Sequence, residues 1–153
     1  MIKYTKEELN TILENHKLWF NDRTTGKRAD LSGANLIDTD LYYADLRGAD
    51  LSGAYLIDAN LKDADLRGAT LISANLMDAV LMDADLTCAD LRGATLISTF
   101  LSDSKLVCAD LKGANLKGAD LENADLYQTN LEYANLADVD LTLVDLTNAK
   151  YYE

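Results

Sequence analysis

A leucine stands at every fifth position from Leu31 to Leu146, without a break. All 24 positions of this register are leucine, and 18 of the 24 positions two residues earlier are alanine. A helix cannot use this period, because five residues advance by about 500° and the leucines would spiral around every side. A straight strand cannot use it either, because an odd spacing sends successive leucines to opposite faces. The chain must therefore turn a corner once per pentad, so that every leucine points towards a common axis.

The residues after each leucine suit such corners. Two residues after a leucine, the chain has seven of its eight glycines, and aspartate, asparagine or serine at eleven further positions. These residue types tolerate a positive φ or bond their own backbone in tight turns. Residue types also recur at a lag of twenty, as in Arg47 and Arg67 or in Ile37 and Ile57. Four pentads should therefore make one coil, which predicts a four-sided solenoid of about six coils.

The pattern A(D/N)LxG, repeated from Ala29 to about Ala149, resembles the pentapeptide-repeat family. This resemblance implies an all-β solenoid with the fold of a right-handed quadrilateral β-helix. The stretch ENHKLWFNDRTTGKRADLSGANL, from Glu14 to Leu36, is also similar to the start of many small cyanobacterial members.

We expect three segments: a capping helix and lead-in at 1–28, the β-helix at 29–150, and a C-terminal tail at 151–153. The capping helix should run from Thr5 to about Leu18, because Thr5 and Glu8 have the spacing of a capping box. Its apolar face combines Leu9, Ile12, Leu13 and His16, and Trp19 and Phe20 should then pack on the first coil.

The other end of the solenoid is expected to be poorly covered. Tyr151 takes the leucine register, and Tyr152 stands beside it. A solenoid edge with unpaired backbone invites edge-to-edge association. Together with Leu143, these tyrosines predict an end that forms a homodimer, which the family resemblance also implies for some members.

The charge of the chain is strongly negative and unevenly placed. The net charge is −12, and residues 1–28 carry six lysine or arginine residues against four aspartate or glutamate residues. The acidic remainder repels nucleic acid, so no direct DNA or RNA binding is expected. No signal peptide and no run of 18 apolar residues is present, so we expect a soluble, cytoplasmic protein without membrane contact.

No residue pattern points to catalysis, a cofactor or a metal. The chain has no phosphate-binding glycine loop, nucleophile elbow or metal-ligand cluster. We expect His16 to be structural, and Cys88 and Cys108 to be free thiols, since parallel side chains on adjacent coils do not suit a disulfide. The column Asp45, Asp65 and Asp85 could supply paired acids or hold a cation, but turn chemistry is favoured because the same pattern occurs on all four sides. We also expect these stacked carboxylates to repel one another.

Several apolar residues occupy outward positions where the pattern has polar ones. They predict an exposed strip along the first four coils: Ile37, Ile57, Met77, Ile97, Val80, Phe100, Met82 and Tyr55. A contiguous apolar patch often marks an interaction surface. The alternative is that these residues are only good strand formers.

The sequence therefore favours a non-enzymatic protein–protein interaction module, an acidic rigid rod that presents this strip to a protein partner in a regulatory role. The family resemblance implies an alternative, a DNA mimic that binds DNA gyrase and confers quinolone resistance. Two features weigh against this alternative: the central residue is always leucine, without the frequent phenylalanine of those members, and the unbroken coils leave no projecting loop. A third alternative is a free-standing structural protein with no specific ligand.

Overall fold

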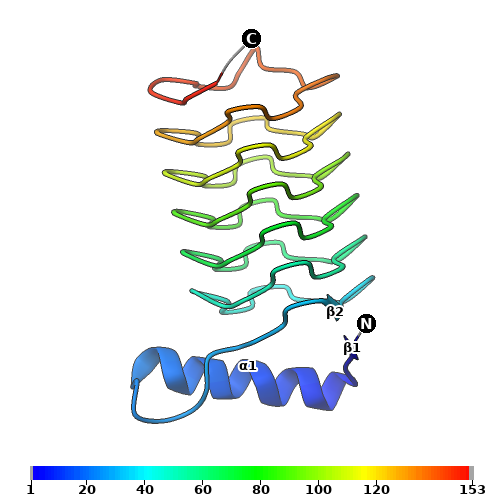
Figure 1. Cartoon of the computed structure of the whole chain (residues 1–153), viewed down its shortest axis with the longest axis vertical. Helices are drawn as coiled ribbons and strands as arrows, with labels where there is room; N and C mark the ends of the chain where they lie inside the picture. Colours follow the sequence, from blue (N-terminus) through cyan, green and yellow to red (C-terminus); the bar gives the residue numbers. More distant parts are fainter. Residues whose placement is uncertain (1, 152–153) are drawn as a thin grey trace.

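The computed structural model describes residues 2–151 of the 153-residue chain. A column of stacked coils stands on helix α1 (Lys6–Asn21), which lies across the N-terminal end of the column (Figure 1). Parallel bridges connect residues twenty apart, from Asp30↔Asp50 to Asn130↔Lys150. Four pentads therefore make one coil, as the lag of twenty predicts. The handedness and the number of coils stay predictions.

The coils contain little continuous strand. Among residues 2–151, the paired strands are β1 (Ile2–Lys3) and β2 (Ala34–Asn35), and the other contacts between coils are isolated parallel bridges. A corner in every pentad interrupts each side of the coil after a few residues. Adjacent coils of the expected β-helix therefore pair through single bridged residues and not through long strands.

The core is a stack of leucine and alanine layers. Every leucine of the register from Leu31 to Leu131 is at most 2% exposed, and most alanines two residues earlier are equally buried. Thr99 and Thr129 replace alanine, and their hydroxyl groups donate to backbone carbonyls of the preceding coil at 2.8 and 2.7 Å. The predicted inward register is confirmed, and the polar substitutions in it remain paired.

One pentad shows where the backbone N–H groups of a repeat go. The N–H groups of Leu51 and Gly53 donate to the next coil at 2.7 and 2.8 Å, and that of Asp50 donates to the preceding coil at 3.0 Å. The Ala54 N–H closes the corner on the Leu51 carbonyl at 3.0 Å, and the Ser52 N–H donates to the Asp50 side chain at 3.0 Å. Each N–H group has an acceptor, as buried backbone requires.

The second residue of every corner but one has a left-handed backbone. Gly53 has a φ of 62°, but Asp58 and even Tyr43 adopt a φ of 55° there. A positive φ at only the third residue of a four-residue turn is typical of a type II turn. Within the described chain, Leu143 is the exception among these corner positions, with no positive φ.

The coil that contains Leu143 pairs incompletely with the coil before it. Asp120 and Asp140 form no bridge, and the N–H groups of Leu121 and Asn123 have no hydrogen-bond acceptor in the described structure. A leucine in the left-handed region costs about 1–2 kcal/mol. Leu143 therefore does not adopt the left-handed conformation that accompanies pairing between coils at most other corners.

Helix α1 begins as predicted and ends later. The Glu8 N–H donates to the Thr5 hydroxyl at 3.1 Å and the Thr5 N–H donates to the Glu8 carboxylate at 2.8 Å, which confirms the capping box. The helix continues to Asn21, three residues past its predicted end, so that Trp19 and Phe20 lie in its last turn. Among residues 2–151, no helix has both the length and the apolar character that crossing a membrane requires.

His16 joins α1 to the first coil. Its side chain is fully buried, its Nδ1 atom accepts the Ala29 N–H at 3.0 Å, and its ring stacks on Trp19 with centroids 5.5 Å apart. The Phe20 ring lies 3.7 Å beneath the guanidinium of Arg47, a residue of the first coil. The predicted structural role of His16 is confirmed, and Phe20 packs on the first coil as expected.

Mild acid is expected to destabilise this junction. Burial lowers the pKa of His16 below its ordinary value, an effect that outweighs the attraction of Asp45. As the pH falls below about 6.5, the unfolded chain binds a proton that the folded chain does not, so the free energy of unfolding falls with pH. Urea unfolding between pH 7 and pH 5 should show this loss. His16→Gln, which cannot titrate, should remove it, and equal slopes for the two proteins would contradict the assignment.

Candidate partner-binding surface

The four sides of the column are named here after the residue that precedes the leucine in the first coil. They are the Asp30, Asn35, Asp40 and Asp45 faces.

The outward residue before each leucine can stabilise the corner with a side-chain hydrogen bond. In 18 of the 24 pentads this residue is aspartate or asparagine, and in all 18 its side chain accepts the N–H group two residues later at 2.8–3.4 Å. Such Asx turns stabilise the corner, so the favoured turn chemistry of these residues is confirmed.

Six pentads lack this side-chain acceptor. The residues at their outward position are Tyr55, Thr70, Val80, Thr95, Phe100 and Lys105. In the described chain, the N–H groups two residues later find no acceptor on a side chain. The three apolar exceptions, Tyr55, Val80 and Phe100, all lie on the Asn35 and Asp40 faces. At these three pentads the corner lacks the side-chain hydrogen bond that most other corners have.

The apolar strip predicted from the sequence covers these two adjoining faces. Its members are Ile37, Ile57, Met77, Ile97, Val80, Phe100, Met82 and Tyr55. The isoleucine and methionine column lies at the corner between the Asn35 and Asp40 faces, where backbone hydrogen bonds of 3.0–3.1 Å join successive coils. Tyr55 is 37% exposed on one face and Phe100 is 46% exposed on the other. The second residues of the corner, such as Asp58, separate the strip into two parts.

Two tyrosines extend this surface, and the sequence reasoning did not select them. Tyr42 and Tyr43 are 49% and 65% exposed at a corner of the Asp40 face, with ring centroids 4.3 Å apart. Tyr42 occupies the same column as Met82. The outward-position criterion that selects Met82 would have selected Tyr42 as well.

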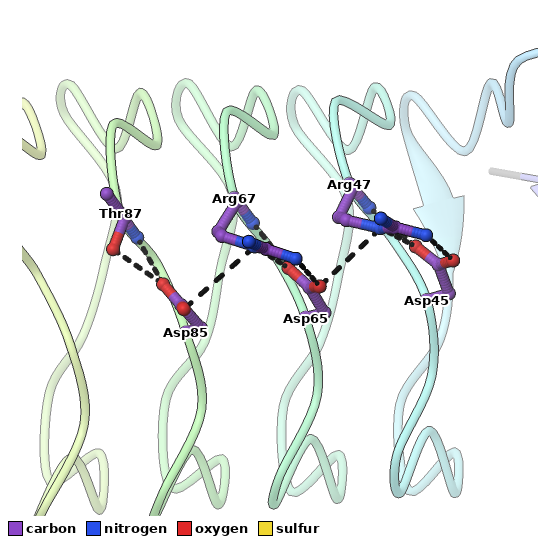
Figure 2. Close-up of polar contacts among 6 residues, drawn as sticks. All are labelled: Asp45, Arg47, Asp65, Arg67, Asp85 and Thr87. Carbon is purple, nitrogen blue, oxygen red and sulfur yellow. Dashed lines mark hydrogen bonds and ion pairs between the residues drawn. The ribbon is translucent and has the colours of Figure 1, made fainter. Parts of the chain in front are cut away.

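The Asp45 face carries a ladder of alternating charges, shown in Figure 2. The Arg47 guanidinium donates to Asp45 at 2.8 and 2.5 Å and lies 3.5 Å from Asp65, and Arg67 repeats this arrangement between Asp65 and Asp85. The expectation that these stacked carboxylates repel one another is wrong, because an arginine lies between successive carboxylates. Arg47 and Arg67 therefore neutralise these carboxylates, so that no bound cation is needed to do so.

The electrostatics of the paired carboxylates follow from these contacts. Hydrogen bonds from Arg47 hold the pKa of Asp45 below its ordinary value, and Arg92 lowers the pKa of Asp90 in the same way. Arg92 also lies 3.8 Å from Asp110 in the next coil. The Asp45 and Asp30 faces therefore carry partly neutralised aspartates.

The carboxylates beside the apolar strip are different. Asp58, Asp78 and Asp103 are exposed at corners, and no lysine or arginine of the described structure lies within ion-pair distance of them. Asp83 forms a single ion pair, with Lys62 at 3.5 Å. These three unpaired carboxylates thus lie in the same region as the apolar strip.

The predicted dimer end is exposed. Leu143 is 67% and Tyr151 is 47% exposed, and Tyr152 lies outside the described residues. The inward leucines of this coil, Leu136 and Leu141 among them, are only half-buried. A groove of about 420 Å³ opens beside Leu143, between its coil and the preceding one. Apolar surface is therefore available at this end.

Cys88 and Cys108 occupy corner positions on adjacent coils and are exposed, free thiols. The Cys108 thiol lies 3.3 Å from the side-chain oxygen of Gln128. The predicted absence of a disulfide between them agrees with this arrangement.

Comparison with known proteins gives one family. A family model described as "Pentapeptide repeats (8 copies)" matches residues 27–56, 59–96, 84–123 and 109–148. No curated protein matches the chain.

Solved structures of repeat proteins are also similar. HetL, a pentapeptide repeat protein involved in heterocyst differentiation regulation in the cyanobacterium Nostoc sp. strain PCC 7120, is 32% identical; the match covers 81% of this chain and 68% of HetL, with a TM-score of 0.47. Rfr23 from the cyanobacterium Cyanothece 51142 is 27% identical over 81% of this chain and 88% of its own, with a TM-score of 0.49. QnrB1, a plasmid-mediated fluoroquinolone resistance protein, is 26% identical over 86% of this chain and 69% of its own, with a TM-score of 0.39.

Proposed function

Because the chain belongs to the pentapeptide repeat family, whose members generally serve as structural or interaction modules, we propose that it is a non-enzymatic protein-interaction module. Its binding surface is the apolar strip on the Asn35 and Asp40 faces. The partner is a protein, and the role is regulatory.

One observation supports this proposal above the others. At Tyr55, Val80 and Phe100 an apolar side chain replaces the aspartate or asparagine that caps the corner elsewhere. Each replacement gives up a hydrogen bond that contributes about 0.5–1.5 kcal/mol. Strand propensity spans only about 1 kcal/mol, so it offers little net stability in exchange. Tyr55 and Phe100 are exposed and Val80 is half-buried. Outward residues that do not improve the fold favour a binding role.

The proposal predicts opposite effects on stability and on binding. Val80→Asn with Phe100→Asn should restore two Asx turns, so that the free energy of unfolding stays level or rises by up to about 1 kcal/mol. The same double variant should capture much less of the partner from a lysate of the native organism. Thermal melts and a quantitative pull-down measure the two effects.

Asn60→Val serves as the matched control in the same column. It removes the bond to the Lys62 N–H and the bond to Asp40, at 3.2 and 3.0 Å, and should lower stability by about 1 kcal/mol. If the apolar residues are only strand formers, the Val80→Asn and Phe100→Asn variant should be less stable than the wild-type chain. Asn60→Val should then be more stable than the wild-type chain. Undiminished capture by the folded double variant would also refute the proposal.

DNA mimicry towards gyrase is the competing function, and the charge distribution weighs against it. A duplex presents charge on every side, whereas Arg47, Arg67 and Arg92 neutralise aspartates on two faces of this column. We therefore expect no inhibition in a gyrase supercoiling assay. Inhibition at stoichiometric protein would favour the mimic instead.

The exposed end around Leu143 and Tyr151 is proposed as a homodimer interface. Pairing two such ends would cover half-buried leucines and the open backbone edge. Light scattering should report a dimer of the 153-residue chain. Leu143→Asp with Tyr151→Asp should convert it to a monomer, whereas the same change at Tyr42 and Tyr43, near the other end, should not. A monomeric wild-type chain at high concentration would end this proposal.

A further inference from the structure

The Asp40 face has an apolar centre. Val80 and Phe100 form a parallel bridge on adjacent coils, so their backbones lie about 4.8 Å apart and their side chains belong to one column. Met82 follows Val80 at the neighbouring corner and is half-buried. The N–H groups of Met82 and Ser102 lack the side-chain acceptor that most pentads provide.

Carboxylates border this centre on both sides. Asp58 and Asp78 stand at the corner shared with the Asn35 face, and Asp83 and Asp103 stand at the corner shared with the Asp45 face. All four are exposed. Within the described structure, the only ion pair among them is that of Asp83 with Lys62.

Elsewhere the chain pairs some of its carboxylates internally. On the Asp45 face, arginines placed between stacked aspartates neutralise Asp45, Asp65 and Asp85 (Figure 2). The Asp40 face has no equivalent arginine in the described residues. Charge at the rim of an interface governs attraction and register, while an apolar centre excludes water.

From this arrangement we infer that the Asp40 face binds a cationic amphipathic segment of the partner protein. An apolar side chain of that segment contacts Val80 and Phe100, and lysine or arginine residues on either side of it pair with the two rows of aspartates. This inference rests on the proposed function and specifies its partner. A second copy of the chain is not the occupant of this face, because its acidic side would be repelled by the same aspartates.

A synthetic amphipathic peptide of leucine and lysine, fluorescently labelled, tests this chemistry by anisotropy at low and at physiological salt. We expect saturable binding that weakens with salt. A quadruple variant, Asp58→Asn, Asp78→Asn, Asp83→Asn and Asp103→Asn, should bind about tenfold more weakly, as the loss of four exposed charge contacts implies. Asparagine keeps the left-handed corners accessible, so the fold is expected to survive.

The matched control removes the same number of negative charges, four, from the Asp30 and Asp45 faces. Asp30→Asn, Asp50→Asn, Asp125→Asn and Asp145→Asn keep their Asx turns and should leave binding within about threefold. Equal weakening by the two quadruple variants would show that the peptide senses only net charge, and would overturn the inference. Equal binding of a peptide with glutamate in place of lysine would overturn it too.

Capture of the native partner separates this inference from the proposed function. If the Val80→Asn and Phe100→Asn variant loses the partner but the first quadruple variant retains it, the strip binds a partner that is not cationic, and only this inference fails. If neither variant loses the partner, the proposed function fails as well.

Discussion

Leu86→Ala should lower the free energy of unfolding by about 2–5 kcal/mol. Leu86 is completely buried in the middle of the column, with a layer of leucines on the coil at either side of its own. Removing its side chain forfeits the buried surface and leaves a cavity, because the rigid coils cannot collapse around it. In a solenoid each coil is stabilised mainly by its neighbours, so a defect here weakens both halves. Denaturant unfolding followed by circular dichroism measures this effect.

Leu146 provides the matched comparison. It occupies the same column as Leu86 but lies in the last coil, where it is only half-buried. Leu146→Ala should therefore cost clearly less than Leu86→Ala, because it removes less buried surface. Equal losses at the two positions would mean that the last coil is covered in solution.

Gly26→Ala is expected to have the second large effect. Gly26 has a φ of 69°, and a Cβ atom there would lie 2.2 Å from the Asn15 carbonyl oxygen and 2.6 Å from the Trp19 backbone nitrogen. The left-handed conformation alone costs alanine about 1–2 kcal/mol. The backbone clash adds to that cost and forces the lead-in away from α1. We expect a loss of at least about 3 kcal/mol and exposure of the first coil, visible as a lower melting temperature and as self-association.

Gly33→Ala isolates the conformational part of this cost. Gly33 has a φ of 60°, but no atom lies within 4 Å of its added Cβ. Aspartate, tyrosine and cysteine already adopt this conformation at equivalent corners. The substitution should therefore cost only about 1 kcal/mol. A similar loss at Gly26 and Gly33 would mean that the lead-in does not pack on α1 in solution.

The repeat explains how much of the fold is predictable from residue order. Leu31 to Leu131 are buried, corners follow them, and coils pair at twenty residues, because a periodic pattern specifies the same local backbone and the same inward side at every pentad. The capping box of Thr5 and Glu8 is equally local, since its partners are three residues apart. The eight residues of the apolar strip could be selected for the same reason: outward positions follow directly from the register.

Contacts between coils, and between the lead-in and α1, could not be predicted in this way. Arg47 lies between Asp45 and Asp65, and Gly26 lies against Asn15, only because distant parts of the chain are brought together and side chains adopt particular conformations. Sequence periodicity carries the spacing of Asp45 and Asp65 but not the arginine conformation that turns repulsion into pairing. The residue order alone therefore determines the coil, its core and its outward columns. Only the folded column decides which carboxylates are neutralised and which remain free beside Val80 and Phe100, because ion pairs depend on the distances between side chains of neighbouring coils.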